Sequence, residues 1–203
     1  MKIFCVGRNY VDHAKELGND VPEEPVIFMK PKNALLQPHT PFYYPEFSNE
    51  LHYETELVLR ISKNGKYIPE RQASKYYNAI TVGLDFTARD IQAELKKKGL
   101  PWEKAKAWDN SAVVGTWKEI TPEILKSPIN FSMKNNGEEK QKGLSSDMLF
   151  SFDEIVSHIS NYFSINIGDL IFTGTPAGVG ECVVGDMLEG FLENERLFNV
   201  EIK

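Results

Sequence analysis

Apolar residues in this chain gather in short runs or alternate with polar residues, and both patterns are typical of strands. A buried strand is predicted over residues 3–6, and further strands are predicted over 26–30, 79–86, 170–172, 187–192 and 198–202. Between residues 51 and 61 the odd positions are largely apolar, which predicts one strand of period two. Glu54 and Glu56 occupy even positions of this strand, so their side chains are expected to point the same way.

Helices are expected to be few and scattered between these strands. The helix signals cover residues 10–17 closed by Gly18, 70–78, 87–98 closed by Gly99, and 151–163. Capping boxes are indicated by Thr87 with Asp90 and by Ser151 with Glu154. Hairpin turns are indicated by Asn64-Gly65 and Asn136-Gly137. The pattern therefore predicts a strand-rich architecture.

The composition is that of an ordinary globular chain, because 41% of its 203 residues are hydrophobic and 26% are charged. No repeat or low-complexity stretch divides it, so a single domain over residues 1–203 is expected. The net charge of -6 argues against nucleic acid as a partner. The N-terminal apolar run is too short for a signal peptide or a membrane span. Cys5 and Cys182 favour reduced thiols and a cytoplasmic location.

Acidic residues in the predicted strands are the first candidates for chemistry. Glu54 and Glu56 would lie about 7 Å apart at the backbone, a spacing that lets two carboxylates converge on one hard cation. For the pair alone, a solvated strand face is the simpler interpretation. Asp85 ends an apolar run, where a charge is costly unless it is paired or coordinated. The alternative for Asp85 is an aspartate that starts a helix or turn.

Three further features could contribute to a site. His13 and Glu16 are spaced i, i+3, so the carboxylate could orient the imidazole as a general base, although most such pairs are surface contacts. Lys106 could neutralise a substrate carboxylate or an enolate, or it could be a surface charge. Residues 173–180 lack the Lys-Ser/Thr ending of a Walker loop. They fit a tight turn that brings Thr175 and backbone amides close to a ligand.

Four ordered motifs spread over nearly the whole chain resemble the fumarylacetoacetate hydrolase family. They are G-R-N-Y at 7–10 with His13 and Glu16, H-Y-E-T-E-L at 52–57, L-D-F-T-A-R-D at 84–90, and G-T-P-A-G-V-G at 174–180. The likeness is greatest to the short acylpyruvase and oxaloacetate decarboxylase branch, which consists of the catalytic domain alone.

The resemblance implies an α+β fold, a strand-rich mixed β-sheet roll with a few peripheral helices, and a homodimer. It implies an Mg2+ or Mn2+ ion held by Glu54, Glu56 and Asp85. It places Arg89, Gln92, Lys106 and Thr175 at positions that contact substrate. Residues 10–18 would form a lid helix, in which His13 and Glu16 activate water or move a proton.

The function expected from the resemblance is metal-dependent cleavage of a carbon–carbon bond in a small keto acid. The substrate would chelate the ion through its carboxylate and keto oxygen, and the enolate would be stabilised as acylpyruvate is hydrolysed or oxaloacetate is decarboxylated. One alternative is an isomerase or decarboxylase of a hydroxymuconate-type intermediate. Another, from a different class, is a non-catalytic dimer that binds a keto acid.

Overall fold

The structure is a computed structural model, and it describes residues 1–16, 18, 20–121 and 124–203. The strands are β1 Ile3–Gly7, β2 Val26–Lys30, β3 Leu51–Tyr53, β4 Thr55–Ile61, β5 Tyr77–Asp85, β6 Thr87–Ala88, β7 Ala112–Val114, β8 Lys118–Glu119, β9 Asn130–Asn135, β10 Glu138–Leu144, β11 Leu170–Phe172, β12 Gly180–Glu181, β13 Met187–Leu192 and β14 Glu195–Glu201. The α-helices are α1 Val11–Glu16, α2 Glu70–Ala73, α3 Arg89–Lys98, α4 Glu103–Lys106 and α5 Phe152–Tyr162. Short 3-10 turns cover Lys32–Ala34, Ile124–Lys126 and Ser145–Asp147.

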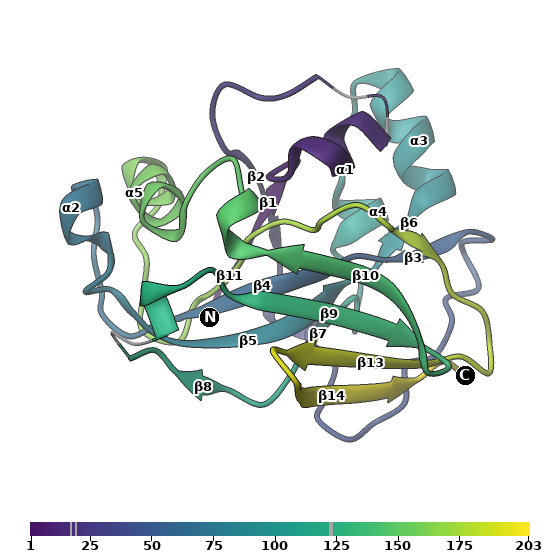
Figure 1. Cartoon of the computed structure of the whole chain (residues 1–203). Helices are drawn as coiled ribbons and strands as arrows, with labels where there is room; N and C mark the ends of the chain where they lie inside the picture. The colour runs from purple at the N-terminus through teal and green to yellow at the C-terminus, as the bar shows by residue number, and fades with distance from the viewer. Residues whose placement is uncertain (17, 19, 122–123) are drawn as a thin grey trace.

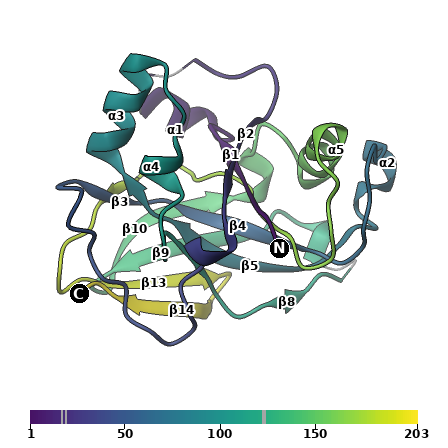
Figure 2. The same cartoon turned by 180° about the vertical axis from the view of Figure 1, so that it is seen from behind.

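The largest sheet is mixed, with the order β2-β1-β11-β4-β5-β7 and β8 paired to β5. Its β1 and β11 run parallel, while its other pairs are antiparallel. A second sheet, β10-β9-β13-β14, lies in front of β4 and β5 in Figure 1 and behind them in Figure 2. A third, small sheet has the order β12-β3-β6. This strand-rich mixed architecture confirms the predicted α+β fold.

The core lies between the two larger sheets, as the alternation along β4 requires. Leu57 and Leu59 point into the larger apolar cluster, where they are buried with Phe131 and Leu188 of the second sheet. Val58 points the other way, into a smaller cluster behind the first sheet. Each face of β4 is therefore covered, and any polar side chain on it is removed from water.

The helices form two groups at opposite ends of the sheets, and both views agree on this arrangement (Figures 1 and 2). α2 and α5 pack together at one end, and α1, α3 and α4 gather at the other. In the described residues, no helix is both long and apolar enough to cross a membrane. Both cysteines are free, as predicted, and both are buried.

Several predicted elements have the predicted boundaries or chemistry. β2 spans the predicted residues, and Gly99 ends α3 in the left-handed conformation with φ of 64°. The capping box of Ser151 and Glu154 is present at the start of α5. Asn136-Gly137 joins β9 to β10 with positive φ at both positions, as a tight hairpin requires.

The predicted continuous strand over 51–61 is wrong at Glu54. β3 pairs with β6 and β12 in the small sheet, whereas β4 pairs with β5 and β11 in the large one. The chain changes sheet at Glu54, which places this residue at a junction.

Three local signals on either side of β5 were also misleading. Asn64-Gly65 makes no hairpin, because Gly65 pairs with Ile165, and the helix predicted over 70–78 ends at Ala73. The capping box of Thr87 is absent, because Thr87 belongs to β6 and its hydroxyl accepts a hydrogen bond from Lys106. Tertiary partners overrode the local preference in each case.

Candidate functional site

Strand register brings the three predicted carboxylates together. β4 and β5 pair so that Glu56 lies opposite Gly83, and the amide of Asp85 donates to the carbonyl of Glu54 at 2.8 Å. Carboxylate oxygens of Glu54, Glu56 and Asp85 consequently lie within 4.8 Å of one another. The three side chains are buried, with relative exposures of 6%, 1% and 0%. A solvated strand face is therefore excluded for the two glutamates.

Two cations reach this carboxylate triad from α3 and α4. Lys106 Nζ lies 2.8 Å from Glu54 and 2.7 Å from Asp85, and Arg89 Nη2 lies 2.6 Å from the other oxygen of Glu54. Burial raises the pKa of Glu54, but the charges of Lys106 and Arg89 outweigh it and hold the pKa well below its usual range. Burial likewise lowers the pKa of Lys106, and the two carboxylates outweigh it and raise the pKa. Lys106 is buried, so it is no surface charge.

Glu56 is the member of the triad whose negative charge is least compensated by neighbouring cations. Its carboxylate accepts a hydrogen bond from the amide of Gly174 at 2.7 Å. Within the described residues it makes no ion pair with a cation. Burial, and then the charges of Asp85 and Glu54, raise the pKa of Glu56 well above its usual value. Glu56 is thus the one carboxylate of the triad that no cation of the described residues pairs with, and the donor atoms of the triad are all oxygens, the ligands of Mg2+ and Mn2+.

A buried lysine that the sequence interpretation missed lies behind the triad. Lys30 Nζ is 2.8 Å from Asp85 Oδ1, and it donates to the carbonyls of Lys106 and of Ser111, the latter at 3.0 Å. Its side chain is completely buried. The only signal in the sequence was a lysine closing an apolar run before Pro31, which also suits an exposed strand end.

On the other side of the pocket, α1 presents His13 and Glu16. His13 Nδ1 is 3.4 Å from Glu16 Oε2, and both oxygens of Glu16 accept from the amide of Gly178, at 3.2 and 3.3 Å. His13 is only 5% exposed, so the pair is more than a surface contact. Burial lowers the pKa of His13, while the nearby charges of Glu54 and Glu16 oppose that shift.

Asn9 fixes the segment that leads into α1, a role that the sequence interpretation missed although the G-R-N-Y motif contains it. Its amide nitrogen donates to the carbonyl of Thr173 at 2.7 Å and of Phe150 at 3.1 Å, and its oxygen accepts from the amide of Phe150 at 2.8 Å. The glycine turn passes close by, because a Cβ on Gly174 would lie 2.7 Å from that of Asn9. The approach to α1 is thereby joined to the turn that contacts Glu56.

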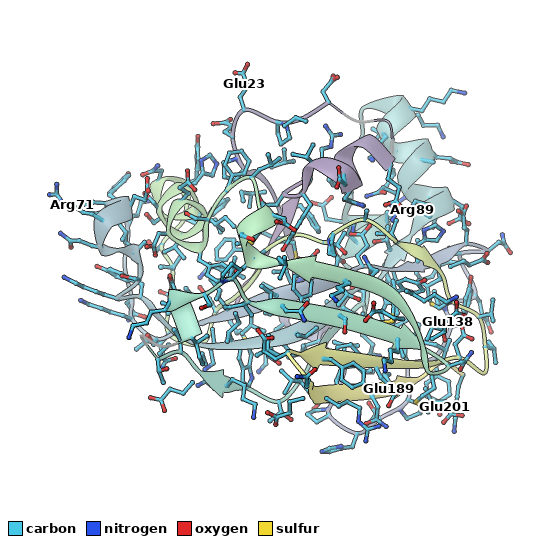
Figure 3. The ribbon with its side chains drawn as sticks, in the orientation of Figure 1. Glu23, Arg71, Arg89, Glu138, Glu189 and Glu201 are labelled. Atoms are coloured by element: carbon cyan, nitrogen blue, oxygen red, sulfur yellow. The ribbon has the colours of Figure 1, made fainter. Side chains whose placement is uncertain are left out.

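The predicted substrate residues lie around the same space. Arg89 Nη1 donates to Gln92 Oε1 at 2.6 Å, and Arg89 is labelled beside α3 in Figure 3. The hydroxyl of Thr175 accepts from Gln141 Nε2 at 2.8 Å. Gln141 also accepts from the amide of Thr55 at 2.9 Å. It is a further buried residue that nothing in the strand pattern singled out.

One pocket collects nearly all of these side chains. It is lined by Val6, Gly7, Arg8, His13, Phe28, Glu54, Glu56, Asp85, Arg89, Gln92, Lys96, Trp102, Lys106 and Thr175. Of the predicted site residues, Glu16 alone is outside this lining, and it contacts the pocket through His13. Segments between residues 6 and 175 thus meet at one cavity that both carboxylates and cations line.

Known proteins with similar sequences and structures match this chain over nearly its whole length. Mouse oxaloacetate tautomerase FAHD1, mitochondrial, is 40% identical over 203 residues, which cover 99% of this chain and 91% of the mouse protein. Escherichia coli oxaloacetate tautomerase YcgM is 39% identical over 190 residues, covering 92% and 86%.

Among solved structures, fumarylpyruvate hydrolase from Pseudomonas aeruginosa, in complex with Mn2+ and pyruvate, superposes with a TM-score of 0.93. It is 36% identical, and the match covers 100% of this chain and 89% of that one. A 5-carboxymethyl-2-hydroxymuconate delta-isomerase from Mycobacterium smegmatis gives a TM-score of 0.85 at 32% identity, covering 99% and 78%.

Residues 2–203 match the family described as fumarylacetoacetate (FAA) hydrolase C-terminal. This match extends over all four motifs and over every residue that lines the pocket. The chain belongs to the fumarylacetoacetate hydrolase family.

Proposed function

We propose that this protein is a divalent-metal-dependent enzyme that stabilises the enolate of a small keto acid, and that it interconverts the keto and enol forms of oxaloacetate. The observation that carries the proposal is the meeting, in one buried pocket, of the carboxylate triad with His13 and Lys106. Several relatives at 39–41% identity and nearly full length are named oxaloacetate tautomerase, which supports this choice of reaction.

Glu54, Glu56 and Asp85 would hold the ion, either Mg2+ or Mn2+. The absence of a cation partner for Glu56 among the described residues fits a divalent cation, and so does the all-oxygen donor set. When bound, the cation would act as a Lewis acid toward the carboxylate and keto oxygens of the substrate. The Mn2+ in the fumarylpyruvate hydrolase complex supports a metal of this type.

Tautomerisation of oxaloacetate needs one group that moves a proton at carbon and a charge partner for the enolate oxygen. His13 suits the first role, because its lowered pKa keeps the imidazole neutral and able to accept a proton near neutral pH. Glu16 would orient the ring. Lys106 suits the second role, because its raised pKa keeps the ammonium charged. Arg89, Gln92 and Thr175 would position the substrate.

Cleavage of a carbon–carbon bond, the reaction expected from the sequence, is a second candidate. The pairing of His13 with Glu16 favours it, because the same base could activate water to attack the distal carbonyl of an acylpyruvate. The pyruvate bound to fumarylpyruvate hydrolase is consistent with this chemistry. Decarboxylation of oxaloacetate would need the same enolate stabilisation without water.

Other predictions from the resemblance remain proposals. α1 would act as a lid over the pocket, since its His13 is buried there and its Glu16 docks on the amide of Gly178. The single domain, the homodimer and the cytoplasmic location also stay predictions. The mouse relative is named as a mitochondrial protein.

The deciding experiment supplies the protein with oxaloacetate enol, and separately with acetylpyruvate, in the presence of Mg2+, Mn2+ or a chelator. Loss of the ultraviolet absorbance of the enol reports tautomerisation, while pyruvate and carbon dioxide report cleavage and decarboxylation. Glu54→Gln tests the triad. Glu138→Gln, on an exposed glutamate of β10, is the matched control.

Metal-dependent loss of the enol without pyruvate, abolished by Glu54→Gln alone, would establish the tautomerase. Pyruvate from acetylpyruvate would instead establish hydrolysis, and carbon dioxide from oxaloacetate would establish decarboxylation. If neither substrate reacted, both candidate functions would be contradicted. In that case, the isomerase of a hydroxymuconate-type intermediate or the non-catalytic binder would be the better account.

A further inference from the structure

Two cations in the pocket have no carboxylate partner among the described residues: Arg8, from the end of β1, and Lys96, from α3. Both are half-buried. They differ in this from Arg89 and Lys106, which are engaged by Glu54 and Asp85. The charge of the triad therefore does not account for Arg8 and Lys96.

The backbone of Arg8 is held in an unusual conformation. Its φ of 61° lies in the left-handed region, which residues with a side chain seldom adopt outside functional or tight-turn positions. The neighbouring residues hold it there, because Gly7 is paired in β1 and Asn9 is fixed by Phe150 and Thr173. Nε of Arg8 is buried and has no hydrogen-bond partner in the described part of the chain. This buried guanidinium donor is therefore free to hydrogen-bond to an acceptor atom of a ligand.

Lys96 reaches the same pocket from α3. Its ammonium lies 5.7 Å from the ring centre of Trp102, which also lines the pocket. Burial lowers the pKa of Lys96, and the charges of Arg8 and Arg89 lower it further, so these cations are close enough to repel one another. An anion between Arg8 and Lys96 would relieve this repulsion.

The geometry points to Arg8 and Lys96 as the subsite for the second carboxylate of the substrate, which makes the enzyme selective for dicarboxylic 2-keto acids. This inference rests on the proposed function, in which the first carboxylate and the keto group are taken up at the triad. Arginine suits the role because its planar guanidinium can donate two parallel hydrogen bonds to one carboxylate.

The alternative is a substrate that ends in an uncharged acyl tail instead of a second carboxylate. A neighbouring groove shares Phe28, Trp102 and Lys106 with the pocket and continues along Val26 and Leu100, so it offers an apolar surface. A neutral tail in that groove would leave Arg8 and Lys96 unpaired in the closed site, at a cost in affinity. A site built for a charged group rejects an analogue that lacks it more strongly than an apolar site rejects an extra group. The unpaired cations therefore favour the dicarboxylic acid.

The test uses two non-enolisable ligands that differ at this one group. In dimethyloxaloacetate, two methyl groups block the carbon between the two carbonyl carbons. In trimethylpyruvate, a third methyl group replaces the distal carboxylate. Titration calorimetry with the Mn2+-loaded protein measures the binding of each ligand. Because dimethyloxaloacetate is still a β-keto acid, a carbon dioxide assay of the titrated solution checks that it has not been decarboxylated.

The variants are Arg8→Gln, which removes the charge, Arg8→Lys, which keeps it, and Lys96→Gln. Lys97→Gln is the matched control, because it makes the same change on an exposed neighbour in α3. Arg8→Gln should weaken dimethyloxaloacetate binding about tenfold or more and Lys96→Gln about fivefold, in line with the loss of one charge-assisted hydrogen bond. Trimethylpyruvate binding and Mn2+ affinity should stay within about twofold in all of them.

Arg8→Lys should recover part of the lost affinity, and Lys97→Gln should bind both ligands like the wild type. The subsite would be overturned if the variants bound both ligands more weakly by the same factor. It would also be overturned if the wild type bound the two ligands with equal affinity. If the wild type prefers the dicarboxylate but turns over no keto acid, the proposed function fails while the subsite stands. If it turns over oxaloacetate without that preference, the subsite fails while the function stands.

Discussion

The two sides of the pocket are built in contrasting ways. The carboxylate triad stands at the ends of β4 and β5, where strand register fixes the backbone and paired cations fix the side chains. His13 and Glu16 stand on α1, a helix of six residues. Helices this short have little stability of their own, so α1 depends on its contacts for its position. Those contacts include the amide of Gly178 on Glu16.

This contrast separates two tasks that enzymes often assign to different parts of a fold. Groups that bind and polarise a substrate gain from a rigid scaffold that holds their charges in place before the reaction. Groups that exchange protons with a bound substrate can sit on an element that closes over it. If the division holds, changes on the strands should impair metal binding and activity together, whereas changes on α1 should impair activity alone.

Glu54→Gln should have the largest effect. It removes one charged oxygen ligand and also breaks the ion pairs with Lys106 and Arg89. Metal affinity should fall by more than the roughly 10- to 100-fold loss that follows removal of an outer partner of a ligand. Turnover should fall about 1000-fold. Mn2+ titration and enol-loss assays measure the two losses. Retained metal affinity would contradict the claim that the strand side of the pocket binds the metal.

Lys30→Met should destabilise the fold more than any change on α1. It leaves Asp85 buried without one of its two cations, and removing one partner of a buried ion pair typically costs about 3–5 kcal/mol. Denaturant unfolding of metal-free protein measures the loss. Lys118→Met is a suitable control, because its pair with Glu195 lies at the surface. Equal stability of the two variants would show that the triad does not rest on buried pairing.

His13→Ala should reduce turnover about 100-fold, the lower end for loss of a general acid or base. Metal affinity should stay within about twofold, because, among the described residues, His13 hydrogen-bonds to Glu16 and to no member of the triad. Enol-loss kinetics and Mn2+ titration on one preparation separate the two quantities. Unchanged turnover would remove His13 from the reaction, and a parallel loss of metal binding would mean that the two regions are not independent.

Glu16→Gln should be milder, with turnover reduced about tenfold, since the amide can still accept from Gly178 but orients the imidazole less strongly. The double variant with His13→Ala provides the control. If Glu16 acts only through His13, the double variant should be no slower than His13→Ala. Independent, additive losses would mean that Glu16 has its own role.

The carboxylates could be predicted from the sequence because their arrangement follows from strand geometry. Period two places Glu54 and Glu56 on one face, and Asp85 closes the adjacent apolar run. The break at Glu54 could not be predicted, because it arises where the chain leaves one sheet for another. Lys30 was missed for the same reason. Its partners, Asp85 and the end of α4, are brought to it only by the tertiary fold.

The capping signals show the same limit at a smaller scale. Ser151 and Glu154 make their predicted box because both partners lie within one turn of chain and nothing else competes for them. Thr87 carries a similar signal, but its hydroxyl accepts from Lys106 and its backbone pairs with His52. Local chemistry therefore predicts an element well where its partners lie within one turn of chain, and poorly where distant residues compete for them, as Ile165 does for Gly65.

The smallest expected effect is that of mild acid, and it distinguishes the two sides of the pocket by their titration. Burial lowers the pKa of His13 below its ordinary value of 6.5, so the neutral imidazole persists at neutral pH. Turnover at saturating metal should change less than about twofold from pH 7.5 to 6.5 and fall only as the pH drops through the lowered pKa. The stability contributed by burying neutral His13 is fully present above pH 6.5 and is lost as the pH falls from 6.5 through the lowered pKa.

Protonation of the triad should appear separately, as weaker metal binding, because the raised pKa of Glu56 means that metal and proton compete for it. A pH profile of turnover and one of Mn2+ affinity, each for wild type and His13→Ala, test this. The variant should lose the acid limb of turnover and keep that of metal binding, and an acid limb of turnover unchanged in the variant would assign it to the triad instead.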